Sequence, residues 1–146
     1  MERLKYGPDA EAFEEHYRDA KMYLFRAEQF QKDDQSDSVV FNVACVALEN
    51  YLIALCHLYG VDPGNHNYIC LMDAVETVVD VPPALNEEIR SLDLIFGICS
   101  IENYYHGVPE PSDAARVLAM CDGVQNLFSA EQMASVRAAT RHADHV

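Results

Sequence analysis

The side chains best suited to chemistry lie in one short stretch, which contains Glu102, Asn103, Tyr104 and His106. The residues before this stretch predict a helix whose apolar positions recur at alternating steps of four and three residues. If this pattern is extended, its next two positions are Asn103 and His106. A helix face that turns polar in its last turn could hold His106 in a pocket, as a general base or ligand-binding donor near neutral pH. The alternative is a helix-terminal histidine that stabilises the negative end of the helix dipole.

A second polar group interrupts the most apolar stretch of the chain, from Ser38 to Tyr59. Asn42, Glu49, Asn50 and His57 repeat there at steps of seven and eight residues. At 100° per residue they fall within about a quarter of a helix circumference. They could line a polar groove or a ligand pocket. The interpretation we favour is a solvent-facing strip on an otherwise buried helix, because even a central helix usually exposes one edge.

Acidic and histidine side chains from both polar groups, together with His66, are candidates for a metal site. Carboxylate and imidazole ligands could come from a set of five residues: Glu49, His57, His66, Glu102 and His106. Metal sites inside helical bundles carry Glu-x-x-His pairs on two helices, and only the weaker i, i+4 pair Glu102 and His106 is present here. Glycine-rich phosphate loops and the common hydrolase motifs are also missing from the sequence. We therefore predict no metal and no cofactor.

Charge restricts the partners. The chain of 146 residues has 24 acidic and 10 basic side chains, a formal charge of −14. Such a field opposes the approach of nucleic-acid phosphates unless the cations gather on one face of the fold, and in the sequence they are scattered. The five cysteines are odd in number and unclustered, which is typical of reduced, packed thiols in a reducing compartment. The N-terminus has no apolar signal region, so we predict a cytoplasmic protein.

Hydrophobic periodicity predicts helices throughout. The central helix is apolar nearly all round, which is typical either of a bundle core or of a membrane; its internal Asn, Glu and His residues favour the core, so no membrane contact is expected. Asp37 or Ser38 is expected to cap it, and Gly60 to end it. The predicted helices run from about residue 9 to Phe30, Ser38 to Tyr59, Tyr68 to Val79, Ala84 to about His106, and Ser112 to Phe128, with a short last helix starting at the capping box of Ser129.

These elements predict an all-α fold, an antiparallel up-and-down four-helix bundle with one or two extra short helices. Residues 1–146 are expected to form one domain. Its core spans about 9–128, and 129–146 form a short C-terminal helix and a polar tail.

Several stretches together resemble the HEPN (higher eukaryotes and prokaryotes nucleotide-binding) superfamily. They are a second helix reading ACVALENYLIAL, a turn reading NHN, a long helix ending in Tyr104-Tyr105-His106, and a terminal helix beginning PSDAARVL. The resemblance implies a four-helix bundle, commonly dimeric. Such bundles occur in metal-independent RNases of toxin and defence systems, in partners of minimal nucleotidyltransferases and in nucleotide-binding modules.

The active branches of that superfamily carry an Arg, then four to six positions, then a His. Here His106 is the counterpart of the His, but the positions for the Arg hold Cys99, Ser100 and Ile101. The cation that would hold a scissile phosphate is missing. Arg137 and His142 match the spacing, but they lie in the predicted tail and outside the context of the motif.

The leading hypothesis is therefore a non-catalytic HEPN-like domain that binds a partner protein or a small nucleotide-like ligand, in a toxin–antitoxin, defence or nucleotidyltransferase-associated system. The apolar surplus on several helices predicts a homodimer. Two alternatives remain open. One is a metal-independent RNase with His106 as its base and a cation from Arg90, Arg116 or the tail, and the other is a metal-binding helical-bundle hydrolase.

Overall fold

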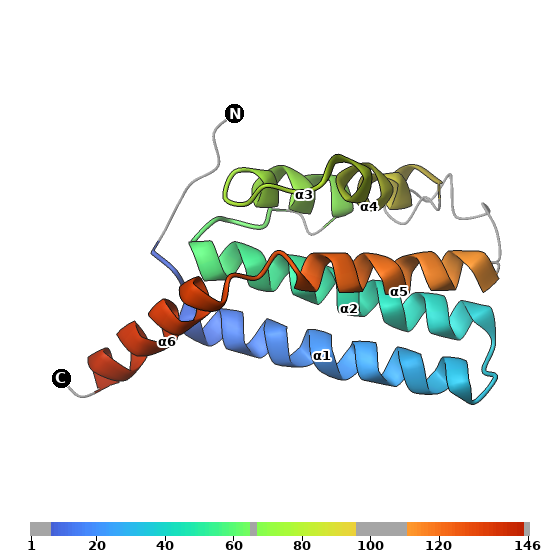
Figure 1. Ribbon diagram of the computed structural model, residues 1–146, viewed down its shortest axis with the longest axis horizontal. Helices are drawn as coiled ribbons and strands as arrows, with labels where there is room; N and C mark the ends of the chain where they lie inside the picture. The colour runs from blue at the N-terminus through green and yellow to red at the C-terminus, as the bar shows by residue number, and fades with distance from the viewer. Residues whose placement is uncertain (1–6, 65–66, 96–110, 145–146) are drawn as a thin grey trace.

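The computed structural model describes residues 7–64, 67–95 and 111–144 of the chain. Within these ranges the fold is all-α, as predicted, and consists of six helices (Figure 1). Their bounds are α1 Ala10–Lys32, α2 Asp37–Tyr59, α3 Tyr68–Glu76, α4 Pro83–Ile95, α5 Pro111–Gln125 and α6 Ala130–Asp144.

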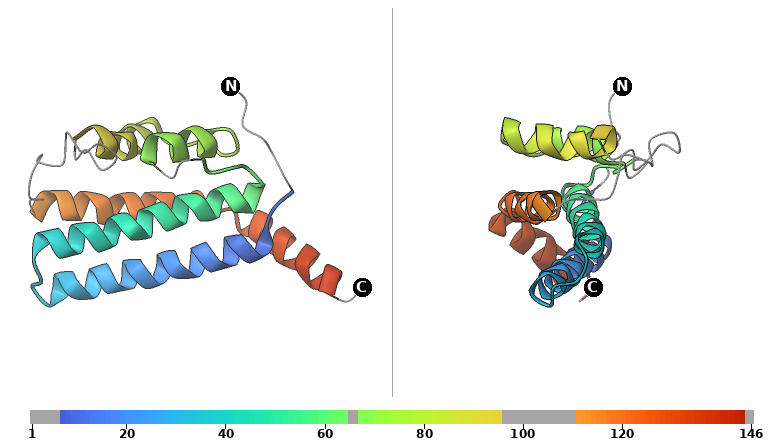
Figure 2. Two further views of the ribbon diagram at one scale, coloured as in Figure 1. Left: turned by 180° about the vertical axis from the view of Figure 1, so that it is seen from behind. Right: turned by 90° about the vertical axis from the view of Figure 1, so that its right-hand side faces the viewer.

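Helix α2 lies at the centre and packs against α1, α3, α5 and α6. Thirteen of its 23 residues are buried, which explains why a helix apolar nearly all round is stable here. Helix α5 runs beside α2 in the same direction, and α1 runs antiparallel to both (Figures 1 and 2). Helices α3 and α4 pack on each other and cover α2 and α5 on the side away from α1.

Local chemistry sets the ends of the first two helices. The Asp9 carboxylate caps α1 by accepting a hydrogen bond from the backbone N–H of Ala12 at 3.0 Å. Ser36 caps α2 through Val39 N–H, so the prediction that Asp37 or Ser38 is the cap was wrong by one or two residues. Gly60 ends α2 with a φ of 74°, a left-handed conformation that favours glycine.

The later helices differ from the predictions mainly at their ends. Helix α3 stops at Glu76 and not at Val79. Helix α4 starts at Pro83, one residue early, and is described to Ile95, so the rest of the predicted Ala84–His106 helix lies outside the described residues. Helix α5 starts at Pro111, which is favoured at a first helical position, and this leaves Ser112 inside the first turn and not at the cap.

The last helix follows its predicted start but exceeds its predicted length. Ser129 Oγ accepts from the backbone N–H of Gln132 at 3.1 Å, as expected for a capping box. The helix then continues to Asp144, through most of the stretch predicted to be a polar tail. Met133 and Val136 pack against a small cluster that includes Phe13 and Phe128, and this contact with the rest of the fold holds α6 in place.

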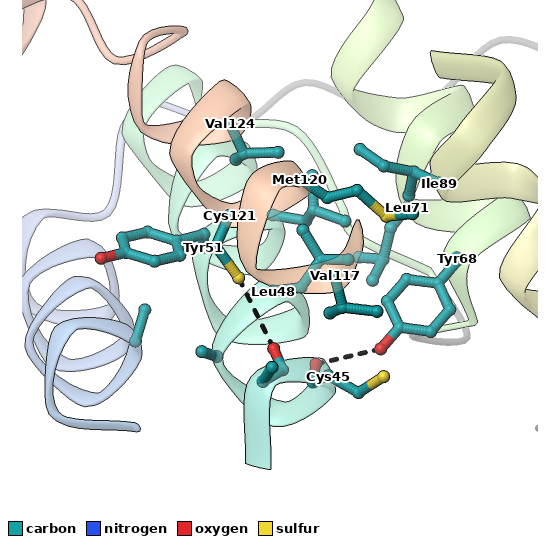
Figure 3. Close-up of a cluster of buried hydrophobic side chains, with 14 of the residues drawn as sticks. Cys45, Leu48, Tyr51, Tyr68, Leu71, Ile89, Val117, Met120, Cys121 and Val124 are labelled. Carbon is teal, nitrogen blue, oxygen red and sulfur yellow. Dashed lines mark hydrogen bonds between the residues drawn. The ribbon is translucent and has the colours of Figure 1, made fainter. Parts of the chain in front are cut away.

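The core between α2, α3 and α5 contains two polar groups that bond to the backbone of α2 (Figure 3). Tyr68 of α3 donates its hydroxyl to the Cys45 carbonyl at 2.9 Å. The Cys121 thiol of α5 donates to the Ala44 carbonyl at 3.6 Å. Among the described residues no buried side-chain polar atom lacks a partner, so the core avoids the cost of an unsatisfied group.

Within the described ranges, one helix, α2, is long and apolar enough to cross a membrane by length and composition. Of its most apolar window, 61% is buried inside the fold. The core helix of a globular protein passes the same test, so this property is accounted for by packing.

Buried thiols give a test of this core. Burial raises the pKa of Cys45 to about 12 and raises that of Cys121 as well. Because the thiolate is the reactive form, we expect iodoacetamide at neutral pH to alkylate both at least about 100-fold more slowly in the native protein than in urea. Peptide mapping by mass spectrometry measures each rate, with half-buried Cys70 as the internal control. Equal native rates for Cys45, Cys121 and Cys70 would contradict the packing.

Candidate functional site

The polar strip predicted on the central helix lies at the surface of the described fold. Asn42 is exposed, and Glu49, Asn50 and His57 are half-buried. Val39 and Val46 lie on the same edge, with exposed fractions of 37% and 38%. We call Val39, Asn42, Val46, Asn50 and His57 the α2 strip.

Glu49 is half-buried next to the α2 strip, and its charge affects two groups of the core. Burial is the main cause that raises the pKa of Cys45, and the negative charge of Glu49 adds to that shift. The same two causes contribute to the raised pKa of Tyr68. Asn50 and His57 turn toward α1.

Helix α1 brings a histidine to Asn50 and His57 that the sequence analysis missed. His16 Nδ1 lies 2.9 Å from Asn50 Oδ1. The His16 and His57 rings are stacked, with centroids 5.7 Å apart and an interplanar angle of 15°. The His16, Asn50 and His57 side chains thus form one cluster across the α1–α2 hairpin.

The hydrogen bonds of this cluster define its protonation pattern. Asn50 Nδ2 donates to the Val46 carbonyl at 2.9 Å, which fixes the orientation of the amide group. Its Oδ1 can then only accept, so His16 carries a proton on Nδ1. One stacked imidazole is therefore positioned by a hydrogen bond, and Asn50 acts as a link between α1 and its own helix.

A small pocket lies beside this cluster, where the start of α1 meets the end of α2. Its volume is about 220 Å³. The pocket is lined by Gly7, Asp9, His57, Gly60, Val61, Asp62 and Pro63. The backbone N–H of Asp9 donates to the His57 carbonyl at 3.0 Å and joins the two helix ends. Two carboxylates in the lining favour a cationic or hydrogen-bond-donating group over a phosphate.

A larger open groove lies at the opposite end of the α1–α2 hairpin. It has a volume of about 490 Å³ and is lined by Gln31, Asp34, Gln35, Ser36, Asp37, Val40 and Ala114. Its charged lining residues are again carboxylates, without a Lys or Arg side chain. Neither cavity offers the cations that nucleotide phosphates require.

The remaining predicted site residues fall in stretches that the structure does not describe. Glu102, Asn103, Tyr104 and His106 lie outside the described residues, as do His66 and Cys99. Over residues 7–64, 67–95 and 111–144, three or more His, Cys, Asp or Glu side chains do not come together in a way that could hold a metal ion. The site residues assigned to the end of the long helix stay predictions.

Comparison with family models, curated proteins and solved structures gives no match for this chain. The HEPN resemblance therefore rests on the sequence stretches given above.

A simple sequence signal could have found His16. In an antiparallel hairpin, paired residues have position numbers with a constant sum. The contacts of Asp9 with His57 and of His16 with Asn50 both sum to 66, which places the turn close to Asp33. A turn centred in the polar stretch 32–37 predicts a register within one helical turn of the observed one. It therefore places Asn50 opposite the part of α1 that contains His16 and Asp19.

The His16–Asn50 bond can be measured by a double-mutant cycle. We expect His16→Ala and Asn50→Ala each to lower the free energy of unfolding by about 0.5–1 kcal/mol, with a coupling energy of about 0.5 kcal/mol because both remove one half-exposed bond. Urea unfolding followed by circular dichroism gives all four values. Asn42→Ala with Asn50→Ala is the control cycle and should be additive. Additive behaviour of the His16 and Asn50 variants would contradict the bond.

Proposed function

We propose that this chain is a non-catalytic, HEPN-like helical domain of the four-helix-bundle class, and that it binds a partner protein. The observation that supports this most is the location of exposed apolar side chains. The exposed large hydrophobic residues of the described fold all belong to the α1–α2 hairpin: Met22, Phe25, Val39 and Val46. Apolar side chains gathered on one element are typical of interaction surfaces.

The α2 strip has the composition of a protein interface. Between Val39 and His57 the only Asp, Glu, Lys or Arg of α2 is Glu49, and its side chain is half-buried. The exposed edge therefore combines two valines with two amides and a histidine. Interface centres are depleted in charged residues in the same way, and this edge contrasts with the charge of −14 on the chain as a whole.

The two cavities described among residues 7–64 and 111–144 favour a partner protein over a small nucleotide-like ligand. The smaller one is below the usual range for ligand pockets and is lined by Asp9 and Asp62. The larger one is lined by Asp34 and Asp37. Carboxylates repel phosphate oxygens, so neither cavity supports nucleotide binding.

Three cations that the RNase alternative could use, Arg90, Arg116 and Arg137, are paired with carboxylates in the described part of the chain. Arg90 lies 2.8 Å from Asp73 and 3.1 Å from Glu76. Burial lowers the pKa of Arg90, but the hydrogen bonds to these two carboxylates outweigh it and the pKa is raised overall. Arg116 lies 3.6 Å from Glu88, and Arg137 lies 2.5 Å from Glu14. An arginine neutralised by carboxylates is a poor ligand for a scissile phosphate, which supports a non-catalytic domain.

Binding through the α2 strip predicts position-dependent cross-linking in cells. A photoreactive benzoylphenylalanine at Val46 should give a discrete adduct with another protein, at least about ten-fold more abundant than from the same probe at exposed Glu87 of α4. Mass spectrometry of the purified adducts identifies the partner and the linked peptide. Adducts of equal abundance and identity from both positions would contradict a binding face on α2.

An RNA cleavage assay tests whether the domain is non-catalytic. We expect pure protein to leave single-stranded RNA intact in EDTA, with a cleavage rate less than about 1% of that of an active metal-independent RNase, because the signature Arg is missing. Gel electrophoresis of labelled RNA measures this. RNA cleavage in EDTA that His106→Ala abolishes would overturn the non-catalytic proposal and favour the RNase.

A further inference from the structure

Helix α1 has a regular row of side chains on the face that points away from α2. The row follows alternating steps of four and three residues, the spacing by which two helices pack along their length. All its members are exposed except Gln29, which is half-buried. This α1 seam comprises Glu11, Glu15, Arg18, Met22, Phe25, Gln29 and Lys32.

The seam is separate from the face of α1 that forms the core. Phe13, Ala20 and Ala27 are fully buried and belong to the core-facing side of α1, which packs on α2. Met22 follows Phe13 by nine residues, which places it about 180° away around the helix. The folding of α1 onto α2 therefore does not use the seam.

The middle of the seam is apolar although it faces outward. Phe25 is 64% exposed and Met22 is 43% exposed. Helix α6 meets α1 at its N-terminal end, where Arg137 pairs with Glu14, and the remaining length of α1 forms one outer border of the molecule (Figure 1). An exposed phenylalanine beside an exposed methionine is an energetically unfavourable arrangement for a free surface.

The order of charges along the seam fits an antiparallel copy of itself. Two glutamates precede Met22, and a lysine ends the row. When two seams run antiparallel and centre on Met22, Glu11 meets Lys32 of the second copy, and Glu15 meets Gln29. Arg18 then meets Phe25 of the second copy, a cation–π pair, and the two Met22 side chains meet on the axis.

The alternative orientation does not fit. A parallel pair would place Glu11, Glu15, Arg18 and Lys32 each against its own counterpart, which is repulsive in all four layers. The two glutamates and two cations of the seam cancel, so it is a neutral path on a chain of charge −14. Neutrality matters because two copies of this chain otherwise repel each other.

We propose that the α1 seam is a self-complementary docking surface through which two copies of this chain associate antiparallel, about a two-fold axis at Met22. Such an isologous contact closes on itself and yields a dimer. The proposal gives the predicted homodimer a specific interface. The dimer proposal depends on the α1 seam and not on the α2 strip. An experiment can therefore disprove the dimer without disproving the partner-binding face, and the reverse.

Charge exchange is the first test of the dimer. In sedimentation equilibrium we expect Lys32→Glu and Glu11→Lys each to weaken dimerisation about ten-fold or more, since each creates two like-charge layers. The double variant Glu11→Lys/Lys32→Glu should return to within about two-fold of the native constant. Ala115→Glu/Ala119→Glu adds the same two negative charges as Lys32→Glu, on exposed positions of α5, and should change the constant much less. A native chain that stays monomeric at high micromolar concentration would overturn the proposal.

Disulfide cross-linking tests the orientation of the two helices. With Cys70 and Cys99 replaced by Ser, Met22→Cys should form a covalent dimer under mild oxidation, because the residue lies on the axis. Glu15→Cys should not, whereas Glu15→Cys/Gln29→Cys should. Equal self-cross-linking of Met22→Cys and Glu15→Cys would refute the antiparallel arrangement. Phe25→Asp should abolish the dimer and leave cross-linking from Val46 unchanged, which separates this surface from the partner-binding face.

Discussion

The structure depends on the burial of α2, because a helix with apolar residues on three sides cannot be stable unless three sides are covered. Helices α1, α5 and α3 provide that cover. Ala44, Ala47 and Ala54 are fully buried, and their small side chains leave room for other helices to pack closely on α2. Larger residues fill the rest of the core, where a fully buried leucine contributes about 2 kcal/mol relative to an exposed one.

The same constraint determines where polar groups can lie. Inside the core, the polar groups of Tyr68 and Cys121 are satisfied by carbonyls of α2. Tyr68 donates to the Cys45 carbonyl, and Cys121 donates to the Ala44 carbonyl. A carbonyl has two lone pairs, so it can accept such a bond in addition to its helical one. These bonds fix α3 and α5 relative to α2. The remaining polar residues of α2 are left to its uncovered edge, where Asn50 bonds to His16 and Asn42 meets solvent.

Hydrophobic periodicity predicted the helices and those helix ends that depend on nearby residues. It did not predict the contacts that depend on residues far away in the sequence. The six helices, the left-handed Gly60 and the Ser129 cap all follow from nearby residues. Three adjacent residues, Ser36, Asp37 and Ser38, can all cap a helix, so composition could not choose among them. Gly123 has a low intrinsic helix propensity, yet it stands inside α5, where Leu85 lies 3.1 Å from where a Cβ would be. Glycine therefore permits close approach of α4 to α5, and His16 likewise needed the hairpin register.

Charge and shape together explain how apolar surface can be kept accessible on this protein. A net charge of −14 opposes unspecific association of copies and of other acidic proteins. Only a surface that is locally neutral and complementary overcomes that repulsion. The hairpin offers two such surfaces. One is the α2 strip, which has amides and valines, and the other is the α1 seam, in which two acids and two bases flank Met22 and Phe25. The proposed binding through these two surfaces is then specific, because the rest of the molecule repels other acidic proteins.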